Sequence, residues 1–204
     1  MKRALVPAAC IFYAVVMMIG IAQAEETVMV VSYAGDVETI FPGQVEPSEH
    51  VPGTLLAYGT RIITGEESHI EITFGRSKGN IIKVKADSEV IIMPSYGDGK
   101  ADIKNGEMTV LLKEIEKGDT FMITSPAAVC WARGTGWNIK TDGEITHVAV
   151  FEGRVFVRGI KDDNTVMEGE YLIDEGYQRK IKRLEQPGEM VGLTRLEKEK
   201  IKWN

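Results

Sequence analysis

The stretch that decides the fold runs from Phe121 to Gly159 and reads FMITSPAAVCWARGTGWNIKTDGEITHVAVFEGRVFVRG. It divides into an apolar run, a turn at Arg133, Gly134 and Thr135, and two further apolar runs. Runs rich in β-branched and aromatic residues between turn residues are typical of strands. The pattern predicts one strand, a turn and two more strands.

The same pattern extends outward in both directions. Between Thr27 and Lys182, turn residues separate short β-branched runs about every 8 to 12 positions, as in a sandwich or barrel. His69 to Phe74 alternates apolar and polar residues, and Ile81 to Ala86 follows a polar turn, which predicts a hairpin. Further strands are predicted at Val28 to Ser32, Val90 to Met93, Met108 to Leu112, Phe121 to Thr124, His147 to Phe151 and Val155 to Val157. The prediction is an all-β fold of short strands.

One short phrase recurs, in which a glycine stands two residues before an apolar residue that opens a strand. It occurs at Gly35, Gly106 and Gly153, at intervals of 71 and 47 residues. The unequal intervals exclude a solenoid of fixed period. Glycine before a strand is common turn chemistry, so the phrase by itself predicts no repeat.

The first 24 residues have the composition of a signal peptide with a signal helix. Lys2 and Arg3 precede an apolar run from Ala4 to Ile21, and small residues precede Glu25. Cleavage after residue 24 would place the protein in the periplasm. The alternative is an uncleaved signal that anchors the chain in the inner membrane, because about 20 apolar residues can span a bilayer.

The remaining chain divides into an all-β domain at residues 25–186 and a C-terminal tail at residues 187–204. In the tail, Thr194 and Glu197 form the sequence pattern of a capping box, which predicts a short helix through Lys200 to Trp203. Leu193, Leu196 and Trp203 would lie along one side of it. We expect the tail to pack on the domain; a helix that docks a partner is the alternative.

Charge and cysteine content exclude some functions. The net charge is −6 for 204 residues, which argues against a nucleic-acid partner because phosphate binding depends on an excess of Lys and Arg. Of two cysteines, Cys130 alone would remain after signal cleavage, so no intramolecular disulfide can form. Its apolar neighbours Val129 and Trp131 predict a buried thiol.

The sequence contains no complete catalytic motif, so we predict that the protein is not an enzyme. Gly75 to Gly79 contains Ser77 in the spacing of a hydrolase nucleophile elbow, but a strand follows where that motif needs a helix. His50, His69 and His147 are scattered, so no metal site and no cofactor is predicted from spacing. A three-histidine site assembled in space, as in a jelly-roll or cupin-like metalloenzyme, is the alternative.

Two phrases together resemble the FecR domain family. One contains Ile123 to Val129, Arg133 to Trp137 and Val148 to Val157; the other runs from Gly59 to Gly65 and continues through Ser68, Ile70 and Glu71. The resemblance implies a periplasmic, jelly-roll-like β-sandwich that takes part in signalling between an outer-membrane transporter and a sigma factor. Only Met1 to Arg3 precede the signal, so we expect a free-standing domain without a sigma-binding segment.

The same phrases supply the candidate site. Arg133, Thr135, Trp131 and Trp137 are the candidate contacts for a ligand or partner, since arginine offers five donors and an exposed indole can stack on sugar or protein. The structural signature consists of Gly59, Gly65, Arg133, Gly134, Thr135 and Gly153. We expect a non-catalytic envelope protein that binds a protein or a cell-wall glycan such as peptidoglycan; an accessory sensor of a transporter and sigma-factor system is the alternative.

Overall fold

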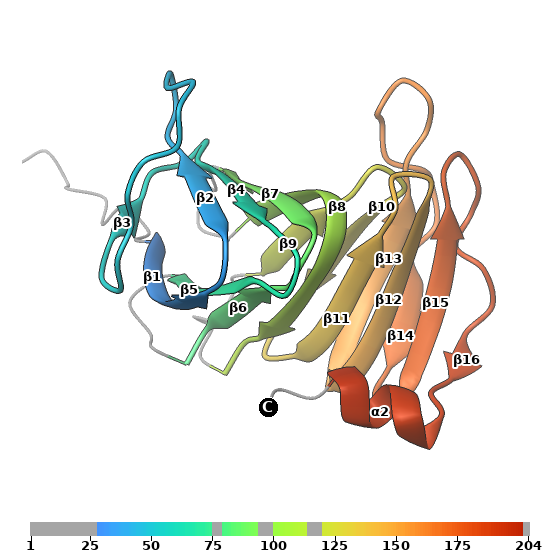
Figure 1. Ribbon diagram of the computed structural model, residues 1–204. Coiled ribbons are helices and arrows are strands. Elements are labelled where there is room, and N and C mark those ends of the chain that lie inside the picture. The colour runs from blue at the N-terminus through green and yellow to red at the C-terminus, as the bar shows by residue number, and fades with distance from the viewer. Residues whose placement is uncertain (1–27, 75–78, 94–99, 114–119, 202–204) are drawn as a thin grey trace, which may run out of the picture.

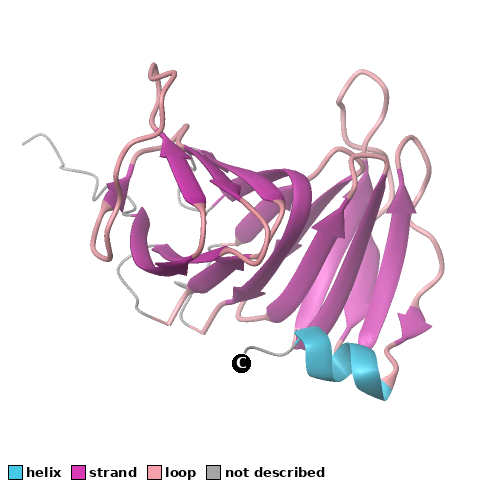
Figure 2. Cartoon of the chain, viewed as in Figure 1, coloured by secondary structure: helices cyan, strands magenta, loops and turns pink. Residues whose placement is uncertain are grey.

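The computed structural model describes residues 28–74, 79–93, 100–113 and 120–201. The predicted signal peptide at residues 1–24 and the Ser77 turn lie outside these ranges. Within them, strands are the main element and one short helix follows at the C-terminal end (Figures 1 and 2). No helix of the described ranges is both long and apolar enough to span a membrane.

The strands form two sheets that pack as a sandwich. Sheet A has the order β3, β1, β5, β6, β8, β11, β12, β15, β16, and sheet B the order β2, β4, β7, β8, β9, β10, β13, β14. The bounds are β1 Val28–Ala34, β2 Val37–Ile40, β3 Leu55–Leu56, β4 Arg61–Thr64, β5 His69–Phe74, β6 Ile81–Val84, β7 Ser88–Met93, β8 Lys100–Leu111, β9 Phe121–Thr124, β10 Ala128–Ala132, β11 Gly136–Thr141, β12 Ile145–Glu152, β13 Arg154–Gly159, β14 Tyr171–Asp174, β15 Tyr177–Lys182 and β16 Val191–Gly192. The predicted all-β sandwich is confirmed.

Strand β8 belongs to both sheets and joins them (Figure 1). Its first half pairs with β7 and, in parallel, with β9 in sheet B, and its second half pairs with β6 and β11 in sheet A. The change occurs at Gly106, whose φ is 99°. A positive φ of this size favours glycine, which explains how one strand can bend sharply between two layers.

The core lies between the two sheets and contains the inward side of almost every strand. Ring contacts cross it: Phe74 of sheet A lies 5.1 Å from Phe121 of sheet B, which lies 6.2 Å from Trp137 of sheet A, measured between ring centroids. Each ring pair is edge-on or tilted, the arrangement that the aromatic quadrupole favours. Cys130 is fully buried in the same core, as predicted.

At three places two neighbouring segments of the chain pass together from one sheet into the other. Each bend lies where a glycine contacts a serine or threonine. We name these contacts the corner pairs; they are Gly35 with Ser68, Gly106 with Ser88, and Gly153 with Thr135. The three glycines have φ values of 78°, 99° and 78°. The phrase that recurs in the sequence therefore marks three equivalent corners of the sandwich rather than a repeat of fixed period.

The hydroxyls of the corner pairs replace backbone hydrogen bonds that the strands lose as they turn. Ser68 Oγ accepts from the amide of Asp36 at 2.8 Å, and Ser88 Oγ accepts from the amide of Glu107 at 2.9 Å. Each serine also donates to the carbonyl two residues before it, at 2.9 and 3.0 Å. Buried backbone groups without partners are costly, so these bonds stabilise the corners.

The fold corrects the prediction for the opening stretch. Between Phe121 and Gly159 there are five strands, β9 to β13, where the sequence predicted three. Strands β10 and β11 were missed because Ala128–Ala132 and Gly136–Thr141 each bury all but one of their residues and show no alternation. The predicted hairpin of β5 and β6 is confirmed, and β16 lies beyond Pro187 in the predicted tail.

The C-terminal helix α2, Arg195–Ile201, begins at the predicted capping box. The amide of Glu197 donates to Thr194 Oγ1 at 3.3 Å, and the amide of Thr194 donates to the Glu197 carboxylate at 2.7 Å. The predicted apolar side was wrong in part: Leu193 is buried against sheet A, but Leu196 is 70% exposed and Ile201 is buried in its place. Trp203 lies outside the described residues.

Substitution of Gly106 by alanine should destabilise the fold more than the same change at Gly43. Both glycines have positive φ, but a methyl group on Gly106 would lie 2.1 Å from Ser88 Oγ, whereas Gly43 has no atom within 4 Å of that position. Backbone strain alone costs about 1–2 kcal/mol, and overpacking adds roughly 1–3 kcal/mol. Urea unfolding of both variants measures the difference, and equal losses would contradict the role given to the corner contact.

Candidate binding surface

A row of apolar side chains crosses the outer face of sheet B. Met122, Trp131, Phe156 and Leu172 stand opposite one another on β9, β10, β13 and β14. The residues on either side of Met122, Trp131 and Phe156 are buried, and so is Ile173 next to Leu172, as strand alternation requires. All four are half-buried, so this outer face presents a continuous apolar strip to solvent.

The centre of this strip is a pair of stacked rings. The Trp131 and Phe156 ring centroids lie 6.0 Å apart with an angle of 18° between the ring planes. The guanidinium of Arg158 lies 5.2 Å from the Trp131 ring centroid and forms an ion pair with Glu170 at 3.4 Å. A cation over an indole face is attracted by the ring quadrupole, which fixes both side chains.

Beside the stacked rings at the centre of the strip lies a hollow of about 300 Å³. Its lining consists of Thr120, Trp131, Ala132, Arg133, Arg154 and Phe156. Both lining arginines are exposed, and Arg154 Nε forms an ion pair with Asp174 Oδ1 at 3.0 Å. The hollow therefore combines an aromatic floor with two cationic side chains.

A single buried hydroxyl connects the backbones of the two arginines. Thr135 is 1% exposed, and its single O–H is shared between the carbonyls of Arg133 and Arg154, each 3.0 Å from Oγ1. These two residues lie 21 positions apart in the chain. The third corner pair thus sets the separation of the two strands at the point where their arginines line the hollow.

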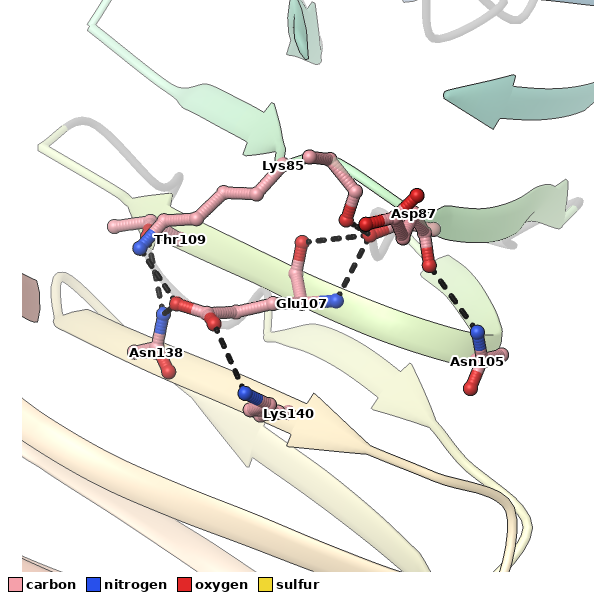
Figure 3. A network of polar contacts seen from close by, with 9 residues as sticks. Lys85, Asp87, Asn105, Glu107, Thr109, Asn138 and Lys140 are labelled. Atoms are coloured by element: carbon pink, nitrogen blue, oxygen red, sulfur yellow. Dashed lines mark hydrogen bonds and ion pairs between the residues drawn. The ribbon is translucent and has the colours of Figure 1, made fainter. Parts of the chain in front are cut away.

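A separate polar network lies on the outer face of sheet A, around Glu107 (Figure 3). The carboxylate contacts Lys85 Nζ at 2.6 Å, Asn138 Nδ2 at 2.9 Å and Lys140 Nζ at 3.9 Å. Burial alone would raise the pKa of Glu107, but the hydrogen bonds and charges of these partners outweigh it and lower the pKa below its usual value. A carboxylate that is held ionised in this way is a poor proton donor. We therefore interpret the network as one that stabilises the pairing of neighbouring strands.

The histidines do not come together. His50 contacts Thr39 Oγ1 at 3.2 Å. His69 is the first residue of β5, and His147 lies within β12. Burial and then the charge of Lys180 lower the pKa of His147. Among the residues that the structure describes, no three His, Cys, Asp or Glu side chains are placed to hold a metal ion.

Residues 60–156 match the family model for FecR protein. The chain contains a FecR domain. The matched range begins at β4 and ends in β13, so it includes Trp131, Arg133 and Arg154 and two complete corner pairs. The resemblance predicted from the two sequence phrases is confirmed.

Two crystal structures of a "putative anti-sigma factor" from Parabacteroides distasonis share this fold, with TM-scores of 0.51 and 0.50. Each is 16% identical in sequence, and each alignment covers 66% of this chain and 59% of that chain. At this low identity the structural likeness shows a common fold alone. No curated protein matches the chain.

The four predicted contact residues of the FecR domain divide into two groups. Trp131 and Arg133 line the hollow. Trp137 is fully buried in the core, so its indole has no surface for stacking on a ligand, and Thr135 is buried with its hydroxyl bonded to the backbone. The prediction of ligand contact is therefore corrected for Trp137, and Thr135 acts on the surface only through the residues that it holds.

The signature glycines lie at turns. Gly134 and Gly153 belong to the third corner, and the amide of Gly65 donates to the carbonyl of Asp36 at 2.9 Å beside the first. Gly59, with φ of 87°, donates from its amide to the carbonyl of Ile92 at 2.7 Å. Their backbone conformations and hydrogen bonds belong to turns of the fold.

The sequence interpretation missed Arg154 and Phe156 as surface residues. A signal for them was present, because Arg154, Phe156 and Arg158 alternate with Val155 and Val157. Such alternation predicts that the arginines and the phenylalanine share the solvent face of one strand. The alternation does not give the register between β10 and β13, and it is this register that places Phe156 beside Trp131.

Replacing Thr135 by valine should cost about 1–2 kcal/mol of unfolding free energy, because both carbonyls lose the hydroxyl donor while the side-chain volume is kept. The matched control is Thr135→Ser, which keeps the hydroxyl and should lose less. Chemical unfolding measures both. A valine variant as stable as the parent would show that the hydroxyl does not hold the corner.

Cys130 should not react with thiol reagents in the folded protein. Complete burial raises the pKa of its thiol to about 12, so the reactive thiolate is negligible at neutral pH. We expect mass spectrometry of the Cys130 peptide to show no alkylation in native buffer and full alkylation in denaturing urea. Rapid labelling in native buffer would contradict the placement of this thiol in the core.

Proposed function

We propose that this chain is a non-catalytic periplasmic protein whose FecR domain binds a protein partner in envelope signalling. The observation that carries the proposal is the apolar strip Met122, Trp131, Phe156 and Leu172 with its flanking arginines. Tryptophan, phenylalanine, methionine and arginine are enriched in protein interfaces. The family match supports a role in signalling at the envelope.

The chemistry of the described residues supports a binding role over catalysis. The candidate nucleophile Cys130 is buried with a raised pKa, and the partly buried carboxylate of Glu107 has a lowered pKa. Neither group is poised for proton transfer or nucleophilic attack near neutral pH. The metalloenzyme alternative would need ligands that the described part of the chain does not bring together.

Aromatic strips can also bind glycans, but this strip favours a protein. Its ends are Met122 and Leu172, which are apolar side chains without hydrogen-bonding groups. Sugar hydroxyls need both donors and acceptors, and among the side chains that line the hollow Thr120 is the one that carries an acceptor oxygen. Apolar and arginine side chains match a protein surface better.

The test is photocrosslinking in the bacterium that encodes the chain, with a benzophenone amino acid in place of Phe156. The control position is Tyr33, an aromatic residue of sheet A that is 40% exposed. We expect protein adducts of discrete mass from position 156 and none from position 33. Adding Trp131→Ala should reduce the adduct on the order of 10-fold or more, as for a central interface residue.

Two outcomes would contradict the proposal. Adducts that contain peptidoglycan and no protein would identify a glycan-binding surface. Equal adducts from positions 33 and 156, unaffected by the change at Trp131, would show that the strip is not the interface.

A further inference from the structure

The hollow beside Trp131 presents an aromatic surface next to two arginines. It could therefore bind a ligand that carries an apolar group and a hydrogen-bond acceptor. Its floor is the stacked pair of Trp131 and Phe156, whose ring planes differ by 18°. Its lining also contains Arg133 and Arg154. A ligand that covers the floor must therefore present an apolar group, and one that reaches the lining arginines meets guanidinium hydrogen-bond donors.

Arg154 is held in place while most of its side chain is exposed. Its Nε contacts Asp174 Oδ1 at 3.0 Å, and its side chain is 69% exposed. That ion pair uses the Nε position, so the terminal amino groups of the guanidinium can bind an incoming carboxylate. Arginine binds carboxylates through two parallel hydrogen bonds, which gives both affinity and orientation.

The two arginines also have fixed backbones. Thr135 Oγ1 lies 3.0 Å from the carbonyl of each, and Arg133 and Arg154 therefore start from one anchored point of the third corner. These bonds fix the separation of the two backbones from which the arginine side chains extend. This anchoring distinguishes them from surface arginines such as Arg195, whose side chain is 93% exposed on α2.

We infer that this hollow binds a peptide segment of the partner in which a carboxylate neighbours an aromatic or aliphatic side chain. The inference rests on the proposed function and specifies the chemistry of that partner. The apolar group would cover Trp131 and Phe156, and the carboxylate would reach Arg154 and Arg133. Arg158, the third guanidinium on this face, is paired with Glu170, so Arg133 and Arg154 are the arginines placed at the hollow.

The length of the strip favours a peptide over a single anionic sugar. Four adjacent strands carry it, and strands lie about 4.8 Å apart, so the strip extends on the order of 14 Å. A peptide can lay successive side chains along that length. A single sugar ring would cover the Trp131 face and leave Met122 and Leu172 exposed.

The experiment is an NMR titration of the exported protein with two blocked dipeptides, acetyl-Phe-Asp-amide and acetyl-Phe-Asn-amide. We expect backbone amide shifts in β10 and β13, with the Asp peptide binding about 10-fold more tightly, as for a charge-assisted hydrogen bond. Arg154→Gln should abolish the difference between the peptides, whereas Arg195→Gln should keep it. N-acetylmuramic acid and N-acetylglucosamine serve as the glycan probes.

Equal binding of the two dipeptides, or binding of neither, would overturn the inference. Tighter binding of N-acetylmuramic acid than of the Asp peptide would overturn it in favour of an anionic glycan. The crosslinking experiment separates these failures from failure of the proposed function. If Arg154→Gln leaves the protein adduct from position 156 unchanged, the acidic-segment inference fails while protein binding stands.

Discussion

The contact between a corner glycine and a hydroxyl side chain is the constraint on which the sandwich depends. A strand that leaves one sheet for the other loses backbone hydrogen bonds at the bend, inside a protein where such losses are costly. A glycine at positive φ lets a neighbouring serine or threonine approach closely enough to supply replacements. The three corner pairs hold β1 to β2, the two halves of β8, and β12 to β13 in their opposite layers.

The second and third corners are related in sequence as well as in space. Ser88 and Gly106 are separated by 18 residues, as are Thr135 and Gly153, and each position recurs after 47 residues. The sheets are exchanged between the two, since β7 lies in sheet B and β11 in sheet A. In the first corner the glycine Gly35 precedes its serine in the chain. This change of order explains why a search for one fixed period finds nothing, although the local structure is the same.

Eight of the sixteen strands that the structure describes were predicted from the sequence, and β5 and β9 match their predicted bounds. Strand β10 was not, because both of its faces are covered except at Trp131. The candidate surface shows the same limit. Trp131 and Arg133 stand out in the sequence, but their partnership with Phe156 and Arg154 arises from the β10 and β13 register. Periodicity gives the face of a strand, and register depends on contacts far apart in the chain.

The Arg-Gly-Thr phrase connects the fold to the surface. Gly134, at φ 56°, makes the turn, Thr135 closes the corner against Gly153, and Arg133 projects into the hollow beside Arg154. Glu67 and Asp87, at φ of 52° and 54°, precede Ser68 and Ser88 in the same way at the other corners. The corners differ in the side chains around them. Arginines and aromatic rings surround the third corner, whereas Glu107 and its lysine partners lie beside the second. A corner required by folding thus holds Arg133 and Arg154 at a fixed separation, and substitution of Thr135 should affect stability and arginine placement together.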